Sequence, residues 1–215
     1  PLEEKLADNF SLSDFVACTD GGLGCVDNRM YNMGEGRDYI TVLSLKKMRP
    51  HLQDWATDAG AQWHTKGYDE GLTLEEAARV FGERFPDMVF YRDRWTKETY
   101  KGGDGKMREL EEHLIVTYSH KYALYQRKTR AEQIARAQTR IGRGESCRPK
   151  SPNDCRRLIR TVSATADGEP AEHAISEIDW EKVYAEERFD GFYAYGTSLD
   201  DHPLDILKAN SFRGE

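Results

Sequence analysis

The sequence lacks the patterns that several protein classes need. It has no apolar run near the ~18 residues of a membrane span. Its first residues, PLEE, have neither the basic region nor the apolar core of a secretory leader. We therefore expect a protein that is not exported and has no membrane partner. The chain begins with proline rather than methionine, so we expect it to be processed or to be part of a longer protein.

Cysteine is scarce, and its spacing gives no metal-binding pattern. The four cysteines stand at positions 18, 25, 147 and 155, without a C-x2-C pair or a histidine at ligand spacing. A zinc site is therefore not indicated. Cys18 lies in an apolar run, where a reduced cysteine packs as a small hydrophobic residue. This use of cysteine fits a reducing compartment, and we expect a cytoplasmic location.

Several motifs of enzyme chemistry are also missing. Asp27 stands where a dinucleotide fingerprint that begins at Gly22 would have its third glycine, and Met107 follows Gly105-Lys106 where a phosphate loop has Ser or Thr. No serine stands in a G-x-S-x-G pattern, and the six histidines form no H-x3-H pair. The sequence therefore gives no support for a nucleotide-binding loop or for nucleophilic hydrolysis.

The charges present are unevenly distributed. The 215 residues suit one large domain or two small ones, and their net charge of −7 argues against nucleic-acid binding when taken whole. Residues 127–160, however, contain eleven Lys or Arg and three acids, a balance of +8 that leaves −15 for the remainder. Such asymmetry indicates a surface that faces a polyanion on an otherwise acidic protein.

The apolar patterns predict an α/β organisation. Residues 15–18 and 39–43 have the character of buried strands, and the polar stretch between them suits a short helix, which favours a parallel pair. Thr73 and Glu76 predict a capping box at the start of a helix. The remaining expectations are strands at 114–117, 158–165 and 192–197, a hairpin turn at 167–168, and a helix from Pro203.

The longest predicted helix covers residues 118–141, where apolar side chains recur at helical spacing. Its mixture of arginines and tyrosines suits phosphate contacts and base stacking. The alternative is a solvated helix face with the tyrosines in the core. If the helix binds DNA, we expect Tyr118, Tyr122 and Ile134 to point inward and its cations to be exposed. The candidate DNA-binding residues of this helix and the loop after it are Arg127, Lys128, Arg130, Arg136, Arg140 and Arg143.

The most specific local feature is the sequence VACTDGGLG at residues 16–24. Asp20 stands at the carboxyl end of a predicted buried strand and is followed by glycines. α/β proteins place metal-binding or catalytic acids there, because the strand fixes the carboxylate and the loop leaves it open to substrate. The residues alone leave open a second interpretation, an aspartate that only forms a turn.

Six segments, taken in order, form a wider pattern: residues 15–23, 38–48, 114–119, 125–128, 151–154 and 189–194. They resemble blocks of bacterial insertion-sequence DDE transposases of the insertion-sequence-four type. The first two resemble the surroundings of that family's second catalytic aspartate. Together the blocks cover nearly the whole chain, which makes the resemblance more specific than a single motif.

The resemblance implies an α/β fold with a partial ribonuclease-H-like core and a large β-rich α+β insertion. Residues 1–48 would carry the second catalytic aspartate, residues 49–187 would form the insertion with the basic helix, and residues 188–215 would return to the core. In this family two aspartates and a glutamate hold two divalent metals that clamp the oxygens of a phosphoryl transfer. Asp20 would be a catalytic residue and a ligand of Mg²⁺ or Mn²⁺.

The rest of the family's catalytic set is not matched. Its first aspartate would precede Pro1. In its Tyr-x2-Arg-x3-Glu-x6-Lys signature, Arg213 matches the arginine and joins the candidate DNA-binding residues, but Asn210 replaces the tyrosine. The glutamate would fall two residues beyond Glu215. We therefore expect an internal fragment of the catalytic domain that is inactive alone.

The resemblance implies that the complete protein cuts transposon-end DNA with metal-activated water and joins the 3′ hydroxyl to target DNA. Its partners would be transposon ends, target DNA and a second copy in the synaptic complex, in a bacterial cytoplasm and associated with the nucleoid. Asp20 would lie near the start of the last helix, at residues 204–213. Two alternatives are a non-catalytic DNA-binding or interaction module derived from a transposase and a small-molecule α/β enzyme that uses Asp20.

Overall fold

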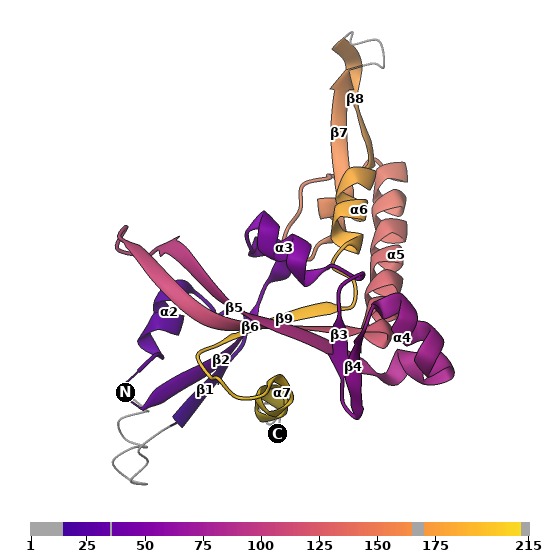
Figure 1. The fold of residues 1–215 in the computed structure, drawn as a ribbon. Helices are drawn as coiled ribbons and strands as arrows, with labels where there is room; N and C mark the ends of the chain where they lie inside the picture. Colours follow the sequence, from indigo (N-terminus) through magenta and orange to yellow (C-terminus); the bar gives the residue numbers. More distant parts are fainter. Residues whose placement is uncertain (1–14, 35, 165–169, 212–215) are drawn as a thin grey trace. The chain divides into compact units, whose positions relative to one another are not determined.

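The chain forms two compact units. The computed structural model describes residues 15–34, 36–164 and 170–211 (Figure 1). The larger unit is formed by the chain up to Ser119 and from Phe192 onward, and the smaller unit by His120–Gly191. The fold is mixed α/β, as the sequence predicts. The division differs from the predicted boundaries after residues 48 and 187, because residues 49–119 continue the sheet of the larger unit.

The larger unit is built on a seven-stranded mixed sheet with the order β1-β2-β9-β6-β5-β3-β4. Its strands are β1 (Phe15–Thr19), β2 (Arg37–Leu43), β3 (Trp63–Thr65), β4 (Tyr68–Leu72), β5 (Val89–Lys101), β6 (Met107–Ser119) and β9 (Phe192–Thr197). Its helices are α2 (Val26–Tyr31), α3 (Pro50–Ala56), α4 (Leu74–Phe81) and α7 (Pro203–Ser211), with short 3-10 helices η1 (Leu45–Lys47) and η2 (Gly82–Asp87).

The first two strands form the expected parallel pair. β1 and β2 run parallel, with Cys18 opposite Ile40, and α2 connects them. β9 has the bounds that the sequence predicts and pairs antiparallel with both β2 and β6. The parallel pair is therefore joined, through a strand from near the end of the chain, to the antiparallel part of the sheet (Figure 1).

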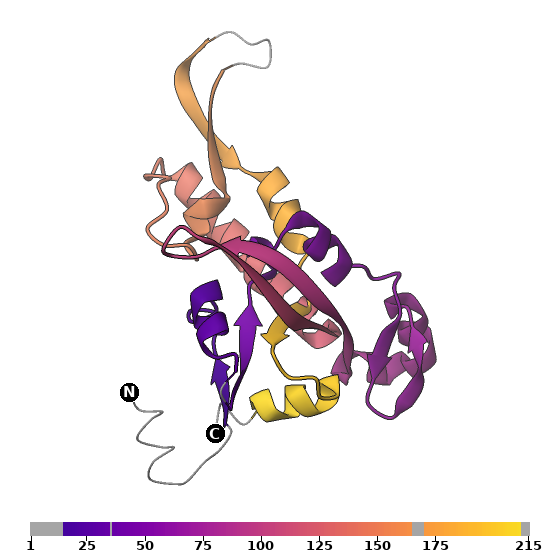
Figure 2. The ribbon, with the colours of Figure 1, turned by 60° about the vertical axis from the view of Figure 1, so that its left-hand side comes forward.

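β5 and β6 form a long antiparallel hairpin that the sequence analysis only partly predicts (Figure 2). The sequence predicts a strand only at residues 114–117, whereas β6 runs from Met107 to Ser119. The first half of β6 has no apolar run because one face of the strand is charged. Exposed Glu109 and Glu111 alternate with buried Leu110 and Glu112. On the outer face, Nζ of Lys97 on β5 lies 2.9 Å from Oε1 of Glu109. A cross-strand ion pair thus replaces apolar side chains on the solvent side of the hairpin.

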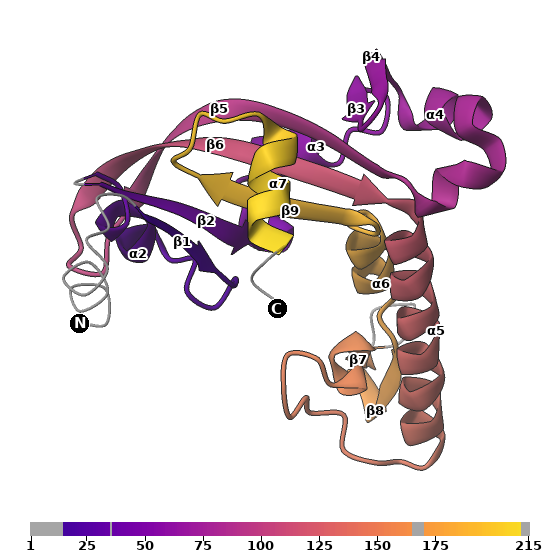
Figure 3. The ribbon, with the colours of Figure 1, turned by 90° about the horizontal axis from the view of Figure 1, so that it is seen from below.

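α7 covers one face of the sheet (Figure 3). Its Ile206 is fully buried and packs with Ile40 of β2 and Ile115 of β6. The expected start of this helix at Pro203 is confirmed. Burial of these branched side chains fixes the position of β2, and with it the turn that follows the neighbouring strand β1.

The predicted capping box at the start of α4 is confirmed. Oγ1 of Thr73 accepts a hydrogen bond from the Glu76 backbone N–H at 3.1 Å, and the Glu76 carboxylate accepts one from the Thr73 N–H at 2.9 Å. Both interactions are local in sequence. This explains why the residues alone identified them.

The smaller unit consists of one long helix packed with a hairpin and a short helix. Its elements are α5 (His120–Gly142), η3 (Cys155–Leu158), β7 (Ile159–Ala164), β8 (Pro170–Ile178) and α6 (Trp180–Glu187). β7 and β8 pair antiparallel. The predicted hairpin turn at residues 167–168 lies outside the described residues. Ala137, Leu158, Ile178 and Val183 form the buried core of this unit.

Candidate functional site

Asp20 directly follows β1 and is exposed. Its backbone carbonyl accepts a hydrogen bond from the Leu23 N–H at 3.1 Å, and its Oδ1 accepts one from the Gly22 N–H at 2.9 Å. The carboxylate therefore shapes the turn, as one interpretation of the sequence predicts. It also stands at the carboxyl end of a strand in a parallel pair, where the other interpretation places a functional acid.

The glycines after Asp20 bring the turn close to β2. A Cβ on Gly24 would lie 3.2 Å from both Oγ1 of Thr41 and the carbonyl oxygen of Val42. Thr41 is held in turn by a 2.7 Å hydrogen bond from Oγ1 of Thr19 on β1. The absence of a side chain at Gly24 thus lets the backbone pack against the strand.

A cavity of about 310 Å³ adjoins this turn within the larger unit. The turn glycines and the end of β2 form part of its wall, and apolar side chains such as Leu52 and Leu114 form another part. The charged and aromatic side chains that line it are Arg29, Lys47, Arg49, Tyr100 and Glu112. Asp20 is adjacent in sequence to the wall but is not one of the lining residues.

A buried charged cluster forms one side of the cavity. Glu112 of β6 accepts hydrogen bonds from Nη1 of Arg29 on α2 and, at 2.9 Å, from the hydroxyl of Tyr39 on β2. Arg29, Glu112 and Tyr39 are all more than nine-tenths buried. Burial and the nearby Glu112 carboxylate raise the pKa of Tyr39, so the phenol remains a hydrogen-bond donor. The cluster links α2, β2 and β6 at the cavity wall.

Gly196 of β9 makes room for this cluster. A Cβ on Gly196 would lie 2.5 Å from Oε2 of Glu112 and 2.9 Å from Cδ1 of Leu43. Any side chain at this position would displace the buried carboxylate and the end of the Leu43 side chain. The sequence analysis missed Glu112 because it stands in a charged run. Glu112 lies two residues after Leu110 and two before Leu114, which places it on the same face of the strand as these leucines. This alternation is the only sequence signal that separates Glu112 from its exposed neighbours.

His113 is a second buried polar group of β6. Its Nε2 lies 2.7 Å from Oδ2 of Asp93, its Nδ1 lies 3.3 Å from the Leu199 carbonyl oxygen, and its ring stacks on Trp95 with centroids 5.2 Å apart. The hydrogen bond with Asp93, opposed by burial, raises the pKa of His113 above its ordinary value of 6.5.

The stability that His113 contributes to the larger unit is therefore expected to decrease as the pH rises. A histidine whose pKa is higher in the folded state than in the unfolded state stabilises the fold. This contribution is complete below the unfolded-state pKa of about 6.5 and is lost as the pH rises through the folded-state pKa. We expect the difference in unfolding free energy between the wild type and His113→Gln to shrink between pH 6 and pH 9 or so. Urea denaturation across this range measures it, with His51→Gln as an exposed control. A difference that grows with pH would contradict the assignment.

α5 begins at His120 rather than at residue 118, because Tyr118 belongs to β6 and pairs with Phe90 of β5. Tyr118 is buried and Ile134 packs against the core of the smaller unit, as predicted. The prediction that Tyr122 points inward is wrong, since 37% of this residue is exposed. It stacks on Tyr125, with ring centroids 6.2 Å apart and an interplanar angle of 16°.

The prediction that Arg130 is exposed is wrong as well. Only 6% of Arg130 is exposed, and its two terminal nitrogens donate to the two carboxylate oxygens of Asp190, with Nη1 at 2.9 Å from Oδ1. Asp190 is itself buried. A bidentate pair of this kind satisfies both charges inside the unit. Arg130 therefore joins α5 to the end of the unit instead of facing solvent.

The remaining candidate cations differ in how strongly acids already hold them. Arg127, Lys128, Arg136 and Arg143 are exposed, and Arg140 is half-buried. Nε of Arg127 lies 3.7 Å from Oδ2 of Asp190. Nε of Arg136 donates to a backbone carbonyl of the same helix. Arg213 lies outside the described residues.

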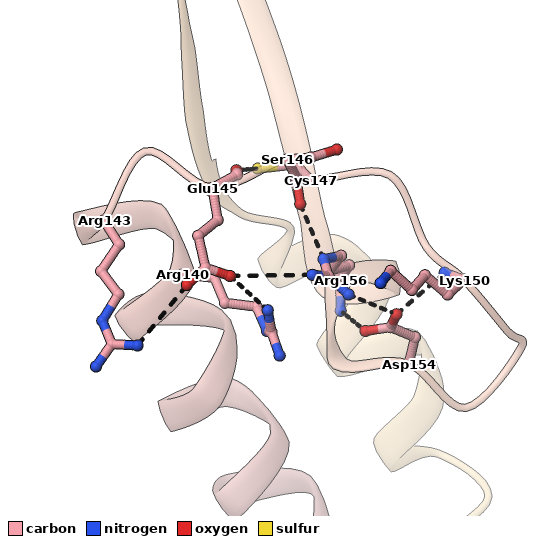
Figure 4. Close-up of polar contacts among 8 residues, drawn as sticks. All are labelled: Arg140, Arg143, Glu145, Ser146, Cys147, Lys150, Asp154 and Arg156. Atoms are coloured by element: carbon pink, nitrogen blue, oxygen red, sulfur yellow. Dashed lines mark hydrogen bonds and ion pairs between the residues drawn. The ribbon is translucent and has the colours of Figure 1, made fainter.

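The end of α5 is neutralised by the loop that follows it (Figure 4). The Glu145 carboxylate pairs with Arg140 and lies within 3.7 Å of Arg143 and 3.9 Å of Arg156. Asp154 accepts hydrogen bonds at 3.0 Å from the Arg156 and Lys150 backbone N–H groups, which hold its pKa far below its usual value. The side chains of Arg140, Arg143 and Arg156 are therefore engaged by acids of this loop.

The described residues do not complete a metal site. Within residues 15–34, 36–164 and 170–211, no three His, Cys, Asp or Glu side chains gather where they could hold an ion. None of the helices in these ranges has the length and apolar character of a membrane span. Comparison with protein-family models, with curated proteins and with solved structures finds no match.

Proposed function

We propose that this chain acts on DNA as part of a transposase catalytic domain of the DDE type. The observation that carries the proposal is the exposed Asp20 at the carboxyl end of β1, in a parallel strand–helix–strand unit. This local arrangement is the one that the resemblance implies for the second aspartate of a ribonuclease-H-like core. The sheet edge that ends in Asp20 would face the DNA strand that is cut and joined.

The exposed side chains of α5 support DNA as the partner. Lys128 and Arg136 offer charge for backbone phosphates, and the stacked rings of Tyr122 and Tyr125 offer aromatic faces for bases. Both cations belong to residues 127–160, which contain eleven Lys or Arg and three acids, and Arg130 and Arg140 in this range are already paired with acids. Phosphate contacts of this kind give affinity without sequence preference.

The chemistry of the complete protein would use Mg²⁺ or Mn²⁺, with Asp20 as one carboxylate ligand. Two divalent ions held by three carboxylates supply water activation in this type of reaction. Asp20 is the candidate ligand that lies among the described residues, and no group of three forms around it there. We therefore assign no catalytic step to the described residues and expect this chain to bind DNA without cutting it.

The same finding favours a second candidate function, a non-catalytic DNA-binding module derived from a transposase. In that case the α5 surface would be retained and Asp20 would only form its turn. Under both proposals, the protein would associate with a second copy of itself and with the nucleoid. The two differ in whether DNA binding depends on Asp20 together with a divalent ion.

The test is the salt dependence of DNA binding. We expect the chain to bind a labelled duplex with a Kd on the order of 10⁻⁴–10⁻⁶ M at physiological salt. Replacing Lys128 and Arg136 by alanine is expected to lower the slope of log K against log salt by up to about 2, because each phosphate contact contributes about 0.9. Fluorescence anisotropy at several salt concentrations measures this slope.

Arg79→Ala is the matched control, because Arg79 is an exposed helical cation of the larger unit, on α4. It is expected to leave the slope unchanged, and circular dichroism verifies that all variants fold. An unchanged slope in the folded Lys128 and Arg136 variant would contradict DNA binding through α5. Metal-dependent cleavage that survives Asp20→Ala would contradict the role of Asp20.

A further inference from the structure

The cavity beside the Asp20 turn carries an excess of positive charge. Arg29, Lys47 and Arg49 line it, and two carboxylates offset part of their charge, Glu112 in the wall and Glu98 beside Arg49. The Glu112 carboxylate already accepts hydrogen bonds from Arg29 and from the Tyr39 hydroxyl. A molecule that enters the cavity therefore meets cations whose charge is only partly compensated. The electrostatics of the wall favour an anion.

Arg29 supplies an unmet hydrogen-bond donor at this wall. It is 6% exposed, and its Nε is buried without a hydrogen-bond partner among the described residues. Its guanidinium lies 5.4 Å from the ring centroid of Tyr100, which also lines the cavity. Buried donors are nearly always paired in folded proteins. Because Nε is itself closed to solvent, a ligand in the cavity meets only the small exposed part of Arg29, which adds positive charge to the wall.

Lys47 supplies a cation that no acid among the described residues engages. Its side chain is exposed at the cavity wall, and it forms no ion pair within the part of the chain that the structure describes. Arg49, by contrast, is held by Glu98 and by the Thr99 carbonyl oxygen. Lys47 can therefore turn toward a ligand without breaking an ion pair within the described residues, whereas the charge of Arg49 is already balanced by Glu98.

We propose that this cavity binds a phosphate group, with Lys47 and Arg29 as its principal cationic contacts. Arginine and lysine are the side chains that bind phosphate most often, through charge-assisted hydrogen bonds. A volume of about 310 Å³ is at the small end of ligand sites and leaves space for an organic group attached to the phosphate. The inference goes beyond the proposed function, because it assigns a ligand to the cavity beside the Asp20 turn and holds whether or not α5 binds DNA.

The phosphate can come from a free mononucleotide or from a nucleic-acid strand. Isothermal titration of the full chain with inorganic phosphate, with deoxyadenosine monophosphate and with a short single strand that lacks a terminal phosphate distinguishes these sources. Binding of the first two alone identifies a phosphomonoester. Binding of the strand in competition with inorganic phosphate identifies a backbone phosphate. Saturable binding by none of the three would overturn the proposal.

Lys47→Ala tests the site with little risk to folding, because the side chain is exposed. We expect affinity for the phosphate ligand that binds to fall about tenfold, the effect of one charged hydrogen bond. Lys46→Ala is the control, since Lys46 is its exposed neighbour and does not line the cavity. Unchanged affinity in Lys47→Ala would overturn the proposal. The Lys128 and Arg136 variant is expected to bind inorganic phosphate normally, so the failure of one proposal is distinguishable from failure of the other.

Discussion

Replacing Glu112 by alanine is expected to destabilise the larger unit by about 3–5 kcal/mol, because it leaves the buried Arg29 guanidinium without its counter-charge. Both side chains are more than nine-tenths buried, and the Tyr39 hydroxyl loses its acceptor in the same change. Hydrogen-exchange mass spectrometry measures the loss through peptides of β2, β6 and β9. Peptides of the smaller unit serve as an internal reference, because they belong to a separate compact unit.

Two further variants separate charge from packing. Glu111→Ala removes an exposed carboxylate on the opposite face of β6 and is expected to change stability by no more than about 0.5 kcal/mol. Glu112→Gln keeps the shape and a hydrogen-bond acceptor, so we expect a loss between those of the two alanine variants. If Glu112→Ala costs no more than Glu111→Ala, the cluster does not hold the sheet together.

Replacing Asp190 by alanine is expected to lower the unfolding free energy of the smaller unit by about 3–5 kcal/mol, because it leaves the buried guanidinium of Arg130 without a counter-charge. The expected result is faster hydrogen exchange in α5 with no change in the peptides of β2 and β6. Replacing Arg130 by methionine and Asp190 by leucine together is expected to cost less than Asp190→Ala alone, because two uncharged side chains need no partner.

Glu187→Ala is the control for the Asp190 variant. Glu187 is half exposed, and its Oε1 lies 3.7 Å from Nε of Arg130, so its removal is expected to cost about 1 kcal/mol or less. Equal losses for Asp190→Ala and Glu187→Ala would show that Arg130 is not held by a buried pair.

Features that depend on neighbouring residues could be predicted from the sequence. The apolar run of β9 and the Thr73–Glu76 capping box were identified correctly, because alternation and capping act over a few residues. The parallel relation of β1 and β2 followed from two apolar runs with a polar crossover. The position of Asp20 at the end of β1 followed from the same pattern.

Features that depend on distant partners could not be predicted in this way. Arg29 and Glu112 are 83 residues apart, and Arg130 and Asp190 are 60 residues apart. A charged residue in a charged run is ordinarily exposed, and only the partner brought by the fold permits its burial. The same limit applies to Tyr122, because helical spacing gives the periodicity of an apolar face but not the partner that covers it.

The close fit between Gly196 and Glu112 has an evolutionary consequence. A side chain at position 196 and a carboxylate at position 112 cannot occupy the same space, and the cation at position 29 has its counter-charge at position 112. A lineage that replaces the carboxylate by a smaller group gains room at 196 but leaves a buried cation at 29. Homologous chains would therefore inherit Arg29, Glu112 and Gly196 together or exchange all three, so that these positions co-vary although they are far apart in the sequence.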